Sequence, residues 1–130
     1  MGGELILIVE DHVLNRKLVR DVLDAKGYRT LVSETGEGGV EIAMKQKPDL
    51  ILMDIQLPGM SGIEAKRRLH ADEQTRAIPV IAITASVMPK NRTDIVAAGF
   101  DDFVFKPISV AALLKTIRTM LDARSGERIA

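Results

Sequence analysis

Three carboxylates, one hydroxyl and one ammonium each follow directly after a short apolar stretch of this sequence. Glu10 and Asp11 follow the first such stretch, Asp54 and Thr84 end the third and fourth, and Lys106 ends the fifth. Two carboxylates about 5 Å apart repel by roughly 3 kcal/mol at an effective dielectric of about 20. If folding brings the three together, a cation is therefore needed. Oxygen ligands without His or Cys favour a hard divalent ion such as Mg²⁺.

A phosphoryl group is the chemical group that suits the remaining side chains. A divalent ion and the Lys106 ammonium would neutralise its oxygens, and the Thr84 hydroxyl would donate a hydrogen bond to it. Asp54, in the centre, would then act as the nucleophile and form an aspartyl phosphate. Catalysis would consist mostly of positioning and charge neutralisation.

Five strands are needed to position these residues, and the apolar pattern predicts them. Continuous apolar runs predict buried strands over residues 5–9, 49–54 and 79–84, with a shorter edge strand over 28–32 and a fifth over 102–105. Helical spacing predicts helices over about 14–23, 37–46, 61–71, 91–98 and 110–121, with Ser61 and Ser109 as caps. Residues 124–130 have no apolar period and are expected to form a flexible tail after a domain of residues 1–123.

Strands that alternate with helices predict an α/β fold with a parallel sheet covered on both faces. In such sheets ligands bind at the carboxyl ends of the strands, where the strand order reverses. The polar residues named above all lie at those ends. The predicted site is therefore one edge of the sheet.

Composition narrows the function classes. The 130 residues include 18 Lys and Arg against 18 Asp and Glu, so no polyanion-binding surface is indicated. With 3% aromatic residues and no Trp, we expect no nucleic-acid binding by base stacking. The apolar runs are too short to span a membrane, no signal peptide is evident, and Cys is absent. These features predict a cytoplasmic location.

Several short motifs together resemble the receiver domain of two-component response regulators (CheY-like), over residues 5–121. The motifs are Val9-Glu10-Asp11, Met53-Asp54, Leu57-Pro58-Gly59-Met60-Ser61-Gly62, Thr84-Ala85 and Lys106-Pro107. The resemblance implies a flavodoxin-like, doubly wound sheet of five strands in the order 2-1-3-4-5. Within the family, Asp54-Ile55-Gln56-Leu57-Pro58 and Lys106-Pro107-Ile108-Ser109-Val110 are most similar to single-domain regulators of cell division.

The resemblance also assigns roles to the residues of the site. Asp54 would be the phosphoacceptor, and Glu10, Asp11 and Asp54 would hold Mg²⁺ together with the main-chain carbonyl of Gln56. Lys106 would contact the phosphoryl group, and a cis peptide is implied before Pro107.

The switch and the partners follow from the same resemblance. Thr84 would move toward the phosphoryl group and Phe103 would turn inward, which remodels the face formed by the fourth helix, fifth strand and fifth helix. Gln56 and Ser86 are predicted to modulate the lifetime of the acyl phosphate. The expected donor is a histidine kinase or a histidine phosphotransfer protein, and the output is a change in protein binding rather than enzymatic turnover of a separate substrate.

Three alternatives stay open. The chain could be a receiver cut from a larger regulator. A haloacid-dehalogenase-like phosphatase also uses an aspartyl nucleophile at a strand end, but Gln56 occupies the position of its second acid. A flavodoxin-like cofactor binder would need a phosphate loop where Glu10 and Asp11 would instead repel a phosphate.

Three surface expectations complete the analysis. The basic cluster of Lys66, Arg67 and Arg68 is expected to be a solvated helix face with a possible kinase contact. Residues 71–77 are charged and polar, and we expect an exposed connection. Glycines 36, 38 and 39 are expected to make a flexible entry to the second helix.

Overall fold

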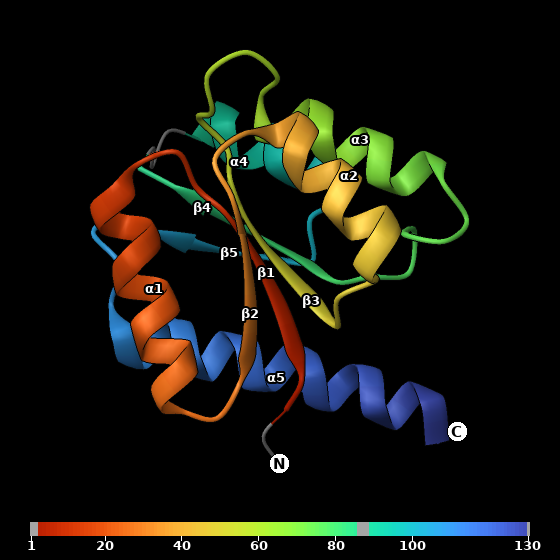
Figure 1. Ribbon diagram of the computed structural model, residues 1–130. Coiled ribbons are helices and arrows are strands. Elements are labelled where there is room, and N and C mark those ends of the chain that lie inside the picture. Colours follow the sequence, from red (N-terminus) through yellow and green to blue (C-terminus); the bar gives the residue numbers. More distant parts are fainter. Residues whose placement is uncertain (1–2, 86–88, 130) are drawn as a thin grey trace.

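A parallel sheet with helices on both faces is the architecture of the computed structural model, which describes residues 3–85 and 89–129 (Figure 1). The strands are β1 (Leu5–Val9), β2 (Arg29–Ser33), β3 (Leu50–Asp54), β4 (Val80–Thr84) and β5 (Asp102–Phe105). The helices are α1 (Val13–Ala25), α2 (Gly36–Gln46), α3 (Gly62–Ala71), α4 (Pro89–Ala97) and α5 (Val110–Ile129). Strands and helices alternate as predicted.

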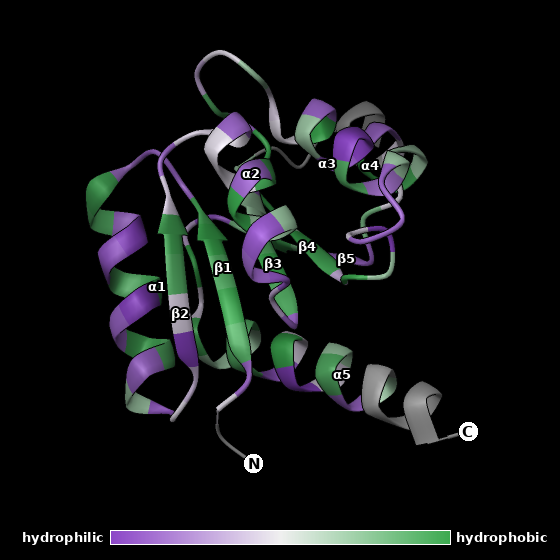
Figure 2. Ribbon diagram, turned by 45° about the vertical axis from the view of Figure 1, so that its right-hand side comes forward, coloured by the Kyte–Doolittle hydropathy of each residue, from purple (hydrophilic) through white to green (hydrophobic). Residues whose placement is uncertain are grey.

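The sheet has the strand order β2-β1-β3-β4-β5, and every pair of neighbouring strands is parallel. This is the predicted flavodoxin-like order. β3 and β4 are buried along their whole length, whereas β2 lies at the edge and is mostly half-buried. Hydropathy differs in a similar way, since β1 is almost uniformly hydrophobic and β2 is not (Figure 2).

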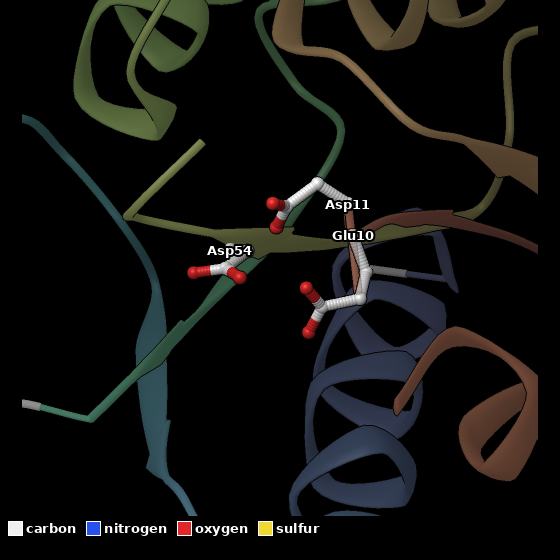
Figure 3. A group of neighbouring side chains, drawn as sticks. All are labelled: Glu10, Asp11 and Asp54. Carbon is white, nitrogen blue, oxygen red and sulfur yellow. The ribbon is translucent and has the colours of Figure 1, made fainter. Parts of the chain in front are cut away.

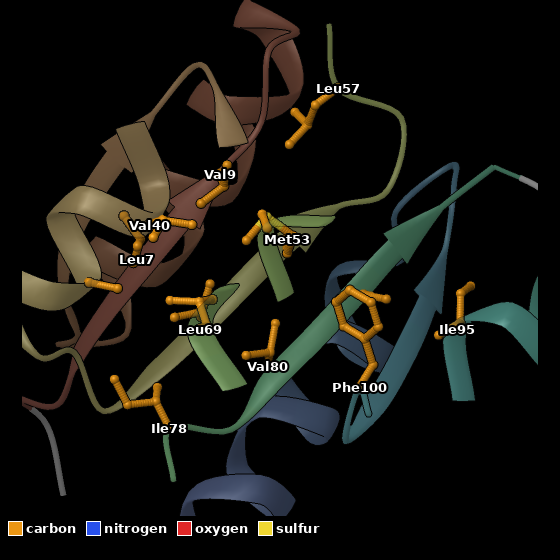
Figure 4. Packing of buried hydrophobic residues seen from close by; sticks show 14 residues of the cluster. Leu7, Val9, Val40, Met53, Leu57, Leu69, Ile78, Val80, Ile95 and Phe100 are labelled. Carbon is orange, nitrogen blue, oxygen red and sulfur yellow. The ribbon is translucent and has the colours of Figure 1, made fainter. Parts of the chain in front are cut away.

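Two hydrophobic cores lie on opposite faces of the sheet, because successive residues of a strand point to opposite sides. One core packs α1 and α5 against the sheet through Val19, Leu23, Leu113 and Ile117. The other packs α2, α3 and α4 through Val40, Leu69 and Ile95 among others (Figure 4). Each face is thus closed by its own helices, and polar groups can gather only at the ends of the strands.

Helix starts agree with the capping predictions. The Ser61 hydroxyl accepts a hydrogen bond from the Glu64 N–H at 3.2 Å, and the Ser109 hydroxyl accepts one from the Ala112 N–H at 3.4 Å. The predicted end of the last helix at Leu121 is wrong, since α5 continues to Ile129. No proline interrupts this segment, so the backbone stays helical without an apolar period. The flexibility expected for residues 124–130 stays a prediction.

Two surface expectations are corrected by the packing, each at a single residue. Lys66 is only 3% exposed and not part of a solvated face. Burial lowers the pKa of its ammonium, and the charge of Asp101 opposes that change. Within the expected exposed connection, Thr75 is buried and its hydroxyl donates to the Leu69 carbonyl at 2.6 Å. Lys66 lies on the core-facing side of α3, and Thr75 lies shortly after the end of that helix. Both side chains are buried for this reason.

Two of the glycines that begin α2 allow close packing. A Cβ on Gly39 would lie 2.7 Å from Cγ2 of Val9, and a Cβ on Gly36 would lie 2.9 Å from the Met60 carbonyl oxygen. Side chains at these positions would force α2 away from β1 and from the loop that follows β3. The structure thus gives Gly36 and Gly39 a packing role, and the flexibility expected of this helix entry stays a prediction.

Candidate functional site

The register of the strands brings the predicted site residues to one edge of the sheet. Val9 pairs with Met53, so Glu10 and Asp54 follow side by side, and Asp54 itself pairs with Ile83. Beyond β4 and β5, the Lys106 N–H donates to the Thr84 carbonyl at 2.8 Å. All these residues leave the sheet at the carboxyl ends of its strands, as the sequence predicts.

Glu10, Asp11 and Asp54 form an acidic cluster in which one oxygen of each residue lies within 4.8 Å of the others. Figure 3 shows the carboxylates of Glu10 and Asp11 directed toward Asp54. Glu10 and Asp54 are buried, with 1% and 2% exposure, whereas Asp11 is exposed. The cluster is therefore open to solvent on the side of Asp11.

Lys106 neutralises part of this charge. Its Nζ lies 2.8 Å from Oδ2 of Asp54, to which it donates a hydrogen bond, and 3.2 Å from Oε1 of Glu10. Burial by itself lowers the pKa of the Lys106 ammonium, but hydrogen bonding and charge attraction from Asp54 and then Glu10 outweigh burial and raise the pKa. Lys106 is therefore a permanent cation beside Asp54.

Glu10 has the most perturbed carboxyl group of the cluster. Burial raises its pKa most, and the hydrogen bond and repulsion from Asp54 raise it further, while the His12 N–H and Lys106 oppose the rise. The pKa of Glu10 thereby moves from 4.5 to about 7. Its Oε1 is buried and, within the described residues, receives no hydrogen bond of good geometry, although the Lys106 charge is close.

A hard divalent cation fits this set of oxygens. Lys106 supplies one positive charge to three acids, and the buried Oε1 of Glu10 has no hydrogen bond from the residues that the structure describes. Such an oxygen is costly to bury and would gain a ligand interaction from an ion. No nitrogen or sulfur ligand belongs to the cluster, so Mg²⁺ fits it better than Zn²⁺.

The loop after β3 positions the carboxylate of Asp54. The Gln56 N–H donates to Oδ1 of Asp54 at 2.9 Å, so Asp54 is held from both oxygens. A Cβ on Gly62 would overlap the backbone carbonyl oxygen of Asp54, because α3 begins directly against the strand end. Glycine at position 62 thus allows the loop to return beside the site.

The predicted switch residues lie on β4, which neighbours the strand of Asp54, and on β5 at the edge beyond it. Thr84 is 2% exposed at the end of β4 and pairs with Phe105 in the register of β5. Phe103 is half-buried, and its ring packs edge to face on that of Phe105 with centroids 5.2 Å apart. Ser86 lies outside the described residues. The peptide bond before Pro107 is cis, as the family resemblance implied.

Sequence reasoning missed Arg16 in α1, whose guanidinium donates to the backbone carbonyls of Glu10 and Asp11. It also missed Glu37, whose carboxylate accepts from the Met60 N–H at 3.3 Å and ties the loop after β3 to α2. No pattern in the sequence signals these contacts, because each depends on how a helix packs beside a loop.

A doubly wound sheet with an acidic cluster and a lysine at its strand ends fits the receiver domain that the sequence motifs resemble. Residues 6–118 match the family described as the response regulator receiver domain, and the chain belongs to that family. It is thus a receiver homologue and not an enzyme that turns over a separate substrate. No helix in the described part of the chain is both long and apolar enough to cross a membrane.

Among curated proteins, the chain is similar to the polar-differentiation response regulator DivK. It is 45% identical to DivK of Brucella ovis over 116 residues, which cover 89% of this chain and 94% of the relative. DivK of Brucella anthropi is 44% identical over the same share of both chains. The likeness to a cell-division regulator noted from the sequence is therefore confirmed.

Solved structures share the same fold. The receiver domain of a sensor histidine kinase from Pseudomonas aeruginosa is 34% identical, with a TM-score of 0.87 over 93% of this chain and 99% of that one. That structure has a magnesium ion coordinated in its active site cleft. The chemotaxis protein CheY4 of Vibrio cholerae is 25% identical, with a TM-score of 0.87 over 92% of this chain and 99% of that one.

Proposed function

We propose that this receiver accepts a phosphoryl group on Asp54 from a phosphohistidine of a histidine kinase or histidine phosphotransfer protein. The observation that carries the proposal is the position of Asp54, a buried carboxylate held between Lys106 and two further acids at the strand ends. An oxygen of Asp54 attacks phosphorus, the P–N bond to the donor imidazole breaks, and an O–P bond to Asp54 forms. In the later hydrolysis, water attacks phosphorus, the O–P bond to Asp54 breaks, and inorganic phosphate leaves as the carboxylate is restored.

The residues around Asp54 have separate roles in this step. Lys106 Nζ, now on Oδ2 of Asp54, is near enough to neutralise an oxygen of a phosphoryl group bound there. Glu10, Asp11, Asp54 and the carbonyl of Gln56 are the proposed ligands of Mg²⁺. The ion, when bound, supplies positive charge to the phosphoryl oxygens. Gln56, exposed beside the site, is the proposed modulator of water access, together with Ser86.

The output is proposed to be a change in protein binding at the face of α4, β5 and α5. Thr84 would contact the phosphoryl group and leave space that Phe103 fills, so the two states differ in the packing of β4 and β5. Val96 on α4 is 66% exposed and Val110 on α5 is 39% exposed, which leaves apolar side chains available to a partner on this face. A partner that binds one state more tightly than the other then responds to phosphorylation.

The donor is proposed to approach over α1. Val13, Leu14 and Leu18 are 60%, 68% and 43% exposed, and α1 begins two residues after Asp11. An apolar surface so near the acids offers a docking site that brings the phosphohistidine to Asp54. By similarity to DivK, we further propose that the protein acts in the cytoplasm in cell-cycle control.

Intact-protein mass spectrometry after incubation with acetyl phosphate tests the proposal. We expect wild-type protein to gain one phosphoryl group in the presence of Mg²⁺ and little or none after chelation. Asp54→Asn should gain none, whereas Asp21→Asn, which changes an exposed carboxylate on α1, should behave as wild type. Equal labelling of Asp54→Asn and wild type would refute the assignment. Steady turnover of a phosphate ester would instead favour the phosphatase alternative.

A further inference from the structure

Arg16 is the side chain that joins α1 to the loop carrying two of the three acids. Its Nη1 donates to the Glu10 carbonyl at 2.9 Å and to the Asp11 carbonyl at 3.4 Å. Its Nη2 pairs with Oε1 of Glu34 at 3.3 Å. The Arg16 side chain is only 15% exposed, whereas that of Glu34 is 73% exposed. Arg16 is thus a largely buried cation fixed on the backbone of the acidic loop.

The two acids depend on Arg16 to different degrees. Glu10 is also held by its own N–H, which donates to the Ser33 carbonyl at 3.0 Å, and by the His12 N–H, which donates to its carboxylate at 3.1 Å. For Asp11, the structure of the described residues contains no hydrogen bond or ion pair other than the contact of its carbonyl with Arg16. Among the described residues, Arg16 is therefore the side chain that restrains the backbone from which the Asp11 carboxylate extends.

We propose that Arg16 is a positioning residue for the divalent ion, because it fixes the Glu10 and Asp11 backbone so that both carboxylates face Asp54. The inference rests on the proposed function, which places Mg²⁺ at these acids. It concerns how the chain prepares the site before the ion binds. Groups that orient metal ligands from outside typically change metal affinity by about 10-fold to 100-fold when removed.

The sign of the effect separates positioning from simple electrostatics. A guanidinium near a divalent cation repels it, so removal of its charge alone would tighten Mg²⁺ binding. Loss of positioning would weaken binding. Arg16→Met removes charge and hydrogen bonds together. Arg16→Lys keeps the charge but cannot reproduce the planar fork, in which Nη1 contacts both carbonyls while Nη2 pairs with Glu34.

Isothermal titration of metal-free protein with MgCl₂ is the test, with Arg20→Met as matched control. Arg20 lies on the same helix, one turn further from the acids, in a weak surface pair with Asp24 at 3.9 Å. We expect the Mg²⁺ Kd to rise about tenfold in Arg16→Met, to rise less in Arg16→Lys, and to stay unchanged in Arg20→Met. Thermal unfolding of each variant shows whether it is folded. If Arg16→Met does not fold, the Mg²⁺ Kd of Arg16→Lys decides the test.

A readout without metal completes the experiment. In metal-free protein, the His12 amide should exchange with deuterium faster in Arg16→Met than in wild type, since the loop is released. Tighter or unchanged Mg²⁺ binding in a folded Arg16→Met would overturn the inference and leave the proposed function intact. If wild type binds no Mg²⁺ and takes up no phosphoryl group, the proposed function fails as well.

Discussion

The pKa of Glu10 predicts that metal-free protein loses stability as the pH rises. In the unfolded chain Glu10 ionises near its ordinary value of 4.5, whereas in the folded protein its pKa is about 7. The folded state therefore binds the proton more tightly, and its advantage is complete only below the unfolded pKa. As the pH rises from 4.5 to about 7, that advantage disappears, because the folded protein must then ionise a buried carboxyl group beside Asp54.

The size of the effect follows from the shift. One pKa unit corresponds to about 1.4 kcal/mol, so the rise from 4.5 to about 7 amounts to about 3 kcal/mol. This is a large part of the stability of a small domain, which is typically about 5–15 kcal/mol. Mg²⁺ should reverse the loss at high pH, since an ion that binds the ionised cluster stabilises only the folded state.

Urea unfolding followed by far-UV circular dichroism, in chelator, measures this dependence. We expect the free energy of unfolding of wild type, relative to Glu10→Gln at the same pH, to fall by about 3 kcal/mol between about pH 4 and about pH 8. Glu10→Gln keeps the shape of the side chain but cannot ionise, and the comparison at equal pH cancels the titration of other groups. If the two proteins change in parallel across this range, the reasoning about Glu10 is wrong.

Three further predictions concern the site. Lys106→Met should leave Asp54 and Glu10 without their cation and reduce the rate of phosphoryl uptake from acetyl phosphate by at least about 10-fold. The initial rate is measured by intact mass against wild type, and an unchanged rate would contradict the prediction. Gly62→Ala should lower the free energy of unfolding by about 1–3 kcal/mol, because the added Cβ would overlap the Asp54 carbonyl. Urea unfolding measures the change, with Glu73→Ala as the control at an exposed position. Thr84→Ala should still be phosphorylated but lose phosphorylation-dependent binding of the output partner, which Thr84→Ser should retain; full binding by Thr84→Ala would refute the switch scheme.

Local sequence determined the elements and the edge at which the site forms. Continuous apolar runs in β1, β3 and β4 can be satisfied only by strands buried on both faces, and the helices between them require parallel strands. Once the strands are parallel, Glu10, Asp54 and Lys106 must leave the sheet at the same edge. Their positions within the sequence were therefore enough to predict a shared edge, whereas the strand order that makes them neighbours followed from the family resemblance.

The tertiary structure alone decided what surrounds and orients those residues. Lysine side chains are usually exposed, yet Lys66 on α3 is buried near the end of α4 and the start of β5. Gly39 permits a close approach to Val9 that no local pattern announces. Arg16 reaches the carbonyls of the acidic loop only because α1 turns back along the sheet. The burial of Lys66 and the contact of Gly39 depend on residues far apart in the chain, and for that reason they follow from packing rather than from spacing.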